Sequence, residues 1–426
     1  MYEMNVKHIE ELVKKQNDWR SRCINLIASE NVTSARMRGI MGSDFSHRYA
    51  EGHPGARFYQ GTEIIDEVES LLTEQMKTIF RCKKADVRPV SGTMANDAVF
   101  SRYIHSGDIV MVNSTPGGGH ISHHRVGSVG KYTKNIVNFP LTADGYHIDV
   151  DQTVYLIKAL EPKLLVLGKS LFLFPEPVKE LSAICRKKGI NLVYDGSHVL
   201  GLIAGGQFQD PLGEGAPLIA ASTHKTFFGS QRGVILSNVE DDEWRKIEKG
   251  TFPGSSSNHH LETLVTLSVA AYETMEFGSE YAKQVIANAK HLAGKLFEAG
   301  FKVQAEKFGF TESHQVAVDF NNFGGGEAVA RTLNDNRIIT NMNLLPFEPL
   351  GNVTHPAGVR LGVQEMTRVG MKQVEMERIA DFFKKILLEK KNMADDVKEF
   401  RSAYQEVLYS FDREKAAPVS KASRAR

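Results

Sequence analysis

The feature that most constrains the fold is an alternation of short apolar strands with amphipathic helices between about residues 85 and 240. The segment 178–189, "VKELSAICRKKG", has the apolar spacing of a helix and ends at a glycine. Apolar or β-branched runs surround it and are predicted to form buried strands at 108–114, 162–168, 190–196 and 233–238. Strand, helix, strand in this order predicts a right-handed crossover. We therefore expect an α/β fold with a largely parallel sheet and helices on both faces.

The rest of the chain indicates a second, smaller unit. Residues 261–300 predict one long helix, and an α+β region follows, with strands in "HQVAVDF" and "GVRLGV" and helices over 371–406. A length of 426 residues also favours more than one domain. We predict an N-terminal arm, a large α/β domain, a small C-terminal α+β domain and a disordered tail that is poor in apolar residues, with bounds 1–30, 31–270, 271–410 and 411–426.

Composition excludes several function classes. There are 52 Lys and Arg against 51 Asp and Glu, so no net field attracts nucleic acid or an acidic membrane. The three cysteines, Cys23, Cys82 and Cys185, show no CxxC spacing and fit reduced thiols inside a cell. No apolar run approaches the roughly 18 residues of a membrane span, and the N-terminus does not resemble a signal peptide. We expect a cytoplasmic protein that binds neither nucleic acid nor membranes.

Polar residues that could take part in catalysis or in binding a cofactor follow three of the predicted strands. Asp195 ends one strand, Ser170 follows another, and Lys225 follows "LIAAS" within "STHKT". Ligands of open parallel sheets bind at the carboxyl ends of the strands. A lysine beside a buried aspartate suits pyridoxal phosphate, because the amine forms a Schiff base and the carboxylate keeps the pyridine nitrogen protonated. Either residue alone is more often structural; together they favour a cofactor site.

A phosphate site and two misleading patterns complete this picture. Ser91, Gly92 and Thr93 open a predicted helix and could supply N–H groups and hydroxyls to a phosphate. "VLGKS" resembles the end of a P-loop, but Lys163 stands where the first glycine is required. The histidine-rich "HISHH" and "NHH" lack a carboxylate or cysteine at ligand spacing, so we predict no metal site.

At this point the chain resembles serine hydroxymethyltransferase (glycine hydroxymethyltransferase), a family of fold-type I pyridoxal-phosphate enzymes. The resemblance extends from about residue 20 to 405 and is closest to the archaeal-type branch. It rests on seven segments in the family's order: "LIASEN", "RYAEGHPGARFYQG", "VRPVSGTMAN", "GGHISH", "DGSHVLGLIAGG", "STHKT" and "VRLGVQEMTRVGM".

The resemblance implies a role for each matching residue around the cofactor. Lys225 would form the Schiff base, Asp195 would pair with the pyridine nitrogen, and His120 would stack on the ring. The remaining cofactor contacts would come from His198 and Ser170 at the ring substituents and from Ser91, Gly92, Thr93 and His224 at the phosphate.

For the substrate, the resemblance implies that Arg360 clamps the α-carboxylate with help from Ser29, and that Glu51 moves a proton near the substrate hydroxyl. Tyr49 and Tyr59 would reach the neighbouring subunit's cofactor and substrate, so the active sites would be shared across a homodimer. Pairing of dimers into a tetramer is left open. The implied reaction moves a one-carbon unit from serine to a reduced pterin, tetrahydrofolate or tetrahydromethanopterin, and leaves glycine.

Several positions depart from the family pattern. An extra residue in "TFFGSQRG" leaves the role of Arg232 open, and "FPGSSSNHH", with Ser255 to Ser257, replaces a glycine-rich phosphate loop. Phe58, Gln60 and His53 change the region where a pterin would bind. A pterin-independent threonine aldolase or transaldolase acting on β-hydroxy amino acids is therefore the alternative.

Overall fold

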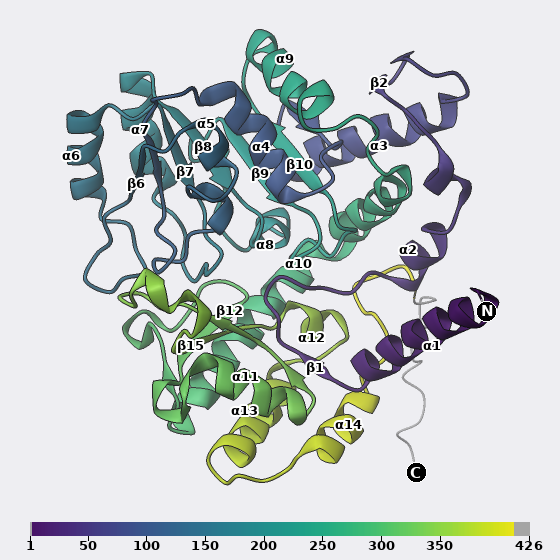
Figure 1. Ribbon diagram of the computed structural model, residues 1–426, viewed down its shortest axis with the longest axis vertical. Coiled ribbons are helices and arrows are strands. Elements are labelled where there is room, and N and C mark those ends of the chain that lie inside the picture. The colour runs from purple at the N-terminus through teal and green to yellow at the C-terminus, as the bar shows by residue number, and fades with distance from the viewer. Residues whose placement is uncertain (1, 413–426) are drawn as a thin grey trace, which may run out of the picture.

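A seven-stranded mixed sheet forms the centre of the large domain in the computed structural model, which describes residues 2–412 (Figure 1). The strand order is β4-β10-β9-β8-β7-β5-β6. Four neighbouring pairs are parallel, and β10 is antiparallel to both of its neighbours. The bounds are β4 (Lys84–Asp86), β5 (Val110–Val112), β6 (Ile136–Asn138), β7 (Leu164–Leu167), β8 (Asn191–Asp195), β9 (Leu218–Ser222) and β10 (Gly233–Ser237).

Both faces of this sheet are buried, which explains why its strands are continuous apolar runs. Successive side chains of a strand point to opposite faces. Leu164 and Val166 of β7 pack in a cluster with α4 (Gly92–Tyr103), α5 (Val129–Tyr132) and α9 (Asp241–Lys249). Leu165 and Leu167 pack in the main core on the other face, which includes residues of α3 (Glu63–Phe80), α6 (Val150–Leu160), α7 (Val178–Lys188) and α8 (Leu200–Ala204). The predicted α/β class is confirmed.

The predicted strand-helix-strand connection is present. The antiparallel direction of β10 was not predicted from the sequence. β7, α7 and β8 form a parallel strand-helix-strand unit, and α7 ends at Gly189 in the left-handed conformation. β10 runs antiparallel because only residues 223–232 connect it to β9, too few for a crossover helix. Lys225 lies within this connection.

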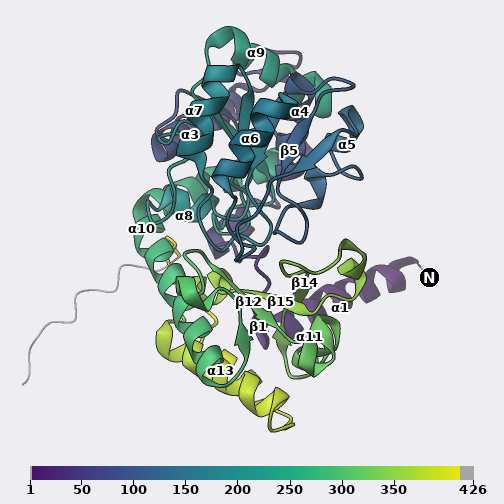
Figure 2. The same cartoon turned by 90° about the vertical axis from the view of Figure 1, so that its left-hand side faces the viewer.

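The small domain contains a four-stranded antiparallel sheet of order β11-β12-β15-β14. Its strands are β11 (Lys302–Val303), β12 (Gln315–Asp319), β14 (Asn341–Asn343) and β15 (Gly358–Gly362). Helices α11 (Gly325–Asp335), α13 (Gln373–Leu387) and α14 (Ala394–Ser402) accompany it. In Figure 2 this unit lies below the large sheet, and α10 (Leu261–Glu298) runs from one unit to the other, across the predicted boundary at 270.

The first and the last described segments both contact other parts of the chain. α1 (Tyr2–Ser21) leads into β1 (Ile24–Asn25), which pairs with β13 (Ile338–Ile339). At the other end, the Asp412 carboxylate accepts hydrogen bonds from the backbone N–H groups at the start of α2 (Ala35–Ile40). The remainder of the predicted tail, residues 413–426, lies outside the described residues. Within residues 2–412 no helix has both the length and the apolar character needed to cross a membrane.

Candidate active site

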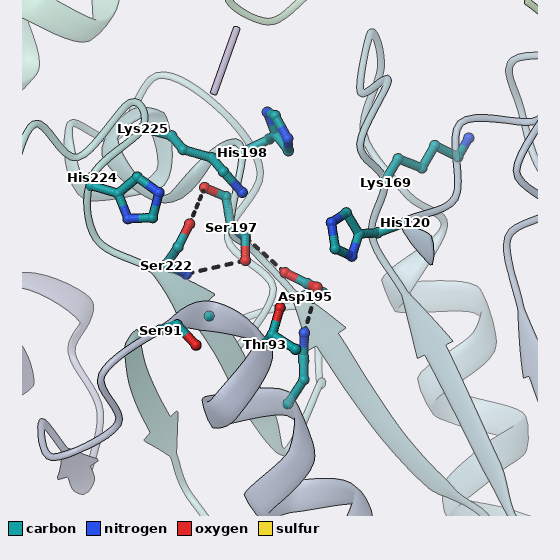
Figure 3. Close-up of a pocket in the computed structure, with 12 residues that line it drawn as sticks. Ser91, Thr93, His120, Lys169, Asp195, Ser197, His198, Ser222, His224 and Lys225 are labelled. Atoms are coloured by element: carbon teal, nitrogen blue, oxygen red, sulfur yellow. Dashed lines mark hydrogen bonds between the residues drawn. The ribbon is translucent and has the colours of Figure 1, made fainter. Parts of the chain in front are cut away.

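A cavity of about 170 Å³ opens at the carboxyl end of the parallel strands. Figure 3 shows side chains from several elements converging on it, among them Lys225, Asp195, His120 and the start of α4. Its lining consists of Ser91, Gly92, Thr93, Asn96, His120, Lys169, Asp195, Ser197, His198, Ser222, His224 and Lys225. Eight of the residues predicted from the sequence are therefore brought together, as the strand-end rule requires.

The start of α4 forms one wall. Ser91 is the N-cap, and its hydroxyl accepts a hydrogen bond from the Met94 N–H. The first N–H groups of a helix have no partner within the helix and favour an anion. Gly92 is required here, because a Cβ on it would lie 2.9 Å from both the Cβ and the backbone nitrogen of Ser222. This close approach brings the end of β9 up to the helix start.

Asp195 lies at the floor of the cavity, held by three donors. Its Oδ2 accepts from Asn96 Nδ2 at 2.7 Å and lies 3.0 Å from His123 Nε2, and its Oδ1 accepts from the Ser197 N–H at 3.0 Å. Burial alone would raise the pKa of Asp195, but the hydrogen bonds and charge of His123 and the bond from Ser197 hold it well below its usual range. The carboxyl group is therefore ionised throughout the neutral pH range.

Lys225 carries a free amine into this cavity. Its backbone carbonyl accepts a hydrogen bond from Asn31 Nδ2 at 2.7 Å, whereas its Nζ has no hydrogen-bond partner among the described residues. Burial lowers the pKa of Lys225 to about 8, with the Asp195 charge opposing and the Arg360 charge adding to this effect. A lowered pKa increases the fraction of the amine that is unprotonated, and the absence of an acceptor within residues 2–412 leaves that amine free to attack an aldehyde.

The histidines of the cavity are neutral. Burial lowers the pKa of His120 to about 4 and that of His224 to about 4, and it lowers the pKa of His198 well below the ordinary value. His224 Nδ1 is buried and has no partner among the described residues. Neutral imidazoles can stack or exchange hydrogen bonds without adding charge beside Lys225.

Arg360 approaches from the small domain and borders the cavity without lining it. Its Nη1 donates to the Ser170 carbonyl at 2.7 Å and to the Ser170 hydroxyl at 2.9 Å. The other edge of the guanidinium is almost unused: Nε is buried without a partner among the described residues, and Nη2 makes only a 3.4 Å contact to Asn341. Two parallel donors on one edge match a carboxylate.

Six predicted site residues do not line this cavity. Ser170 and Arg360 border it, and the other four lie farther along the chain from the lining segments. Ser29 belongs to the segment next to Ala28, whose carbonyl lies 3.2 Å from His314 Nε2. Glu51 precedes the hairpin of β2 (Gly52–His53) and β3 (Ala56–Arg57), and Tyr49 and Tyr59 lie around it with their rings 5.4 Å apart. Tyr49 is 49% exposed and Tyr59 42% exposed. Their contribution to a neighbouring subunit's site stays a prediction.

Arg232 is surrounded by backbone carbonyls, so its guanidinium is not placed to bind a substrate carboxylate. Its guanidinium is fully buried and donates to the backbone carbonyls of Val87, Arg88, His259 and His260. Arg232, directly before β10, therefore joins the start of that strand to two loops, and its donors are already engaged. In the loop that replaces the family's glycine-rich segment, Ser255 and Ser256 hydroxyls donate to the carbonyls of Gly250 and Asn258.

Sequence reasoning missed several cavity residues. Lys169 lines the cavity, but its amine turns away to the Tyr146 carbonyl and to Glu176, 2.6 and 3.2 Å away. His123, Asn96 and Ser197 surround the Asp195 carboxylate. The only available signal for His123 was its place in "HISHH", three residues after His120.

These observations fit pyridoxal phosphate: a free amine, an ionised carboxylate, a helix start that favours an anion and a buried histidine nitrogen without a partner. A family model described as serine hydroxymethyltransferase matches residues 2–383. The chain belongs to the serine hydroxymethyltransferase family. Membership confirms the predicted family and makes the chain a pyridoxal-phosphate-dependent hydroxymethyltransferase.

Individual relatives agree over nearly the whole length. The chain is 46% identical to serine hydroxymethyltransferase of Archaeoglobus fulgidus over 97% of this chain and 95% of that protein. Identity to the enzyme of Pyrococcus abyssi is 49%, covering 94% of this chain and 95% of the relative. For Methanocaldococcus jannaschii identity is 48%, covering 95% and 96%. These relatives are archaeal, as the resemblance implied.

A solved structure shares the fold. The crystal structure of L-threonine transaldolase from Pseudomonas fluorescens, in its internal aldimine state, matches with a TM-score of 0.87 and 28% identity. The match covers 96% of this chain and 94% of that chain. This neighbour confirms the predicted fold-type I architecture.

Proposed function

We propose that this enzyme moves a one-carbon unit from serine to a reduced pterin, tetrahydrofolate or tetrahydromethanopterin, and releases glycine. The observation that carries the proposal is the cavity itself, where the free amine of Lys225, the Asp195 carboxylate and the start of α4 meet. Arg360 borders this cavity, and its Nε is buried without a partner among the described residues. Relatives named serine hydroxymethyltransferase at 46 to 49% identity support serine as the substrate more strongly than the transaldolase at 28% supports the alternative.

Pyridoxal phosphate, when bound, supplies an aldehyde for the amino group and a ring that accepts electrons. Lys225 holds the cofactor through its amine, and Asp195 holds a proton at the pyridine nitrogen. His120 would pack against the ring, and His198 and Ser170 would contact its substituents. The phosphate is bound by Ser91, Gly92, Thr93 and His224.

Arg360 and Ser29 bind and orient the substrate carboxylate. A guanidinium fixes a carboxylate in one plane through two parallel hydrogen bonds. Holding the carboxylate in one plane would fix how the substrate Cα is presented at Lys225. With serine, the bond to be broken would be Cα–Cβ, and its cleavage would release the one-carbon unit to the pterin and leave glycine.

Glu51 is the proposed proton carrier near the substrate hydroxyl. It lies next to Tyr59: partial desolvation and the charge of Glu51 raise the pKa of the Tyr59 hydroxyl. Both residues belong to a surface outside the cavity of their own chain, which supports a homodimer in which Glu51, Tyr49 and Tyr59 serve the partner's site. The other partners are the amino acid and the pterin.

The test compares two substrates in two proteins. Serine cleavage is measured with each reduced pterin, and threonine cleavage is measured without pterin, in the wild type and in Glu51→Gln. Pterin-dependent serine cleavage should collapse in the variant, while slow threonine cleavage persists in part. Glu67→Gln, on the exposed face of α3, is the matched control and should behave as the wild type.

Two results would replace the proposal. A wild type indifferent to every reduced pterin, with a variant that loses both substrates equally, would identify a pterin-independent threonine aldolase. Transfer of the glycine unit of threonine to another aldehyde would identify a transaldolase.

A further inference from the structure

Gln315 joins the small domain to the cavity. It is fully buried on β12, and its amide contacts three groups of the large domain. Oε1 accepts a hydrogen bond from the Phe172 N–H at 2.7 Å, Nε2 donates to the Ser170 carbonyl at 3.0 Å, and Nε2 lies 2.9 Å from His198 Nδ1.

The two backbone contacts fix which end of the amide is oxygen. A backbone N–H can only donate and a carbonyl can only accept. A flipped amide would place an N–H against the Phe172 N–H and an oxygen against the Ser170 carbonyl. Oε1 must therefore face Phe172 and Nε2 must face Ser170.

This orientation determines the tautomer of His198. Nε2 of Gln315 has two hydrogens; one is directed to the Ser170 carbonyl, and the other is directed to His198 Nδ1. A neutral imidazole has one N–H and one acceptor nitrogen, so Nδ1 is the acceptor and Nε2 carries the hydrogen.

A neighbouring histidine does not compete for this hydrogen. His314 Nε2 lies 3.3 Å from Gln315 Nε2, but it also lies 3.2 Å from the Ala28 carbonyl, which needs a donor. Both nitrogens of the 3.3 Å contact therefore carry hydrogens, and it is no hydrogen bond. The His314 ring instead stacks beside His198, with ring centroids 5.7 Å apart.

We propose that Gln315 is a positioning residue that holds His198 as the Nε2–H tautomer, so that His198 presents a hydrogen-bond donor to the cavity. The His198 Nε2 atom has no partner among the described residues, and Figure 3 shows the ring beside Lys225. The donor suits an oxygen on the cofactor ring; this ligand rests on the role proposed for His198 above, whereas the tautomer does not.

Gln315 and Arg360 both bind the loop that contains Ser170. Both side chains donate to the Ser170 carbonyl, from neighbouring strands β12 and β15. The Gln315 amide thus couples the tautomer of His198 to the docking of the small domain beside the cavity.

Neutron diffraction from deuterated crystals of the full chain, with and without pyridoxal phosphate, tests the tautomer directly. Deuterium on His198 Nε2 and none on Nδ1 is the expected result in both crystals. Deuterium on Nδ1 in the cofactor-free crystal would overturn the proposal. The measurement needs neither serine nor a pterin, so failure of the proposed transferase activity leaves it intact.

Gln315→Met tests whether the amide is the cause. Its side chain has similar length and no N–H, so the deuterium should divide between both His198 nitrogens. Removing one neutral hydrogen-bond constraint should weaken pyridoxal phosphate binding roughly threefold to tenfold.

Gln304→Met is the matched control, because Gln304 also links the two domains, accepting a hydrogen bond from the Tyr146 hydroxyl at 3.1 Å, without contacting His198. It should bind the cofactor as the wild type does. A Gln315→Met variant with deuterium only on Nε2 and unchanged cofactor affinity would overturn the role of Gln315.

Discussion

The lowered pKa of Lys225 predicts an unusually reactive amine at neutral pH. A pKa of about 8, against the ordinary 10.5, leaves about one amine in ten unprotonated at pH 7 rather than about one in three thousand. Only the unprotonated amine attacks an aldehyde. Lys225 should therefore be methylated by formaldehyde and a mild reductant about three hundred times faster at pH 7 than a lysine of ordinary pKa.

Two substitutions should move this pKa in opposite directions. Arg360→Met removes a nearby positive charge, so the protonated amine is favoured and the pKa of Lys225 rises. Asp195→Asn removes a nearby negative charge, so the protonated amine loses its partner and the pKa of Lys225 falls.

The assay follows methylation of the Lys225 peptide by mass spectrometry in cofactor-free protein, as a function of pH. The wild-type rate should rise tenfold per pH unit and level off above pH 8, with the midpoint higher in Arg360→Met and lower in Asp195→Asn. Lys169→Met removes the other cavity lysine, whose charge is paired with Glu176, and should leave the Lys225 profile unchanged. A rate still rising tenfold per unit beyond pH 9 in the wild type would refute the reasoning.

Three further predictions concern residues around the cavity. Asp195→Asn should reduce kcat at least about a hundredfold, roughly 3 kcal/mol, since the charge that holds the ring proton is lost; near-normal steady-state turnover would contradict this role. Arg360→Lys should raise KM for serine by an amount equivalent to about 2 kcal/mol, with little change in cofactor affinity measured by titration, because an ammonium cannot make two parallel bonds. Arg232→Met should lower the free energy of unfolding in urea by about 3 kcal/mol, since the buried carbonyls of Val87, His259 and His260 lose their donors. Unchanged stability with a raised serine KM would instead make Arg232 the substrate clamp.

The sequence by itself determined the α/β class and indicated eight of the residues that line the cavity. Strand and helix periodicities are local, and so are the start of α4 at Ser91 and the end of α7 at Gly189. Once the strands are known to be parallel, their carboxyl ends must share an edge, which places Asp195 and Lys225 together.

Tertiary structure alone decided the partners of these residues. The direction of β10, the donors around Asp195 and the carbonyls around Arg232 depend on segments far apart in the chain; His123 is 72 residues from Asp195. Gln315 and His198 are 117 residues apart and meet only when the two domains pack. Periodicity carries no record of such contacts, because a polar side chain at a strand end looks the same whether it faces solvent, a backbone carbonyl or an imidazole.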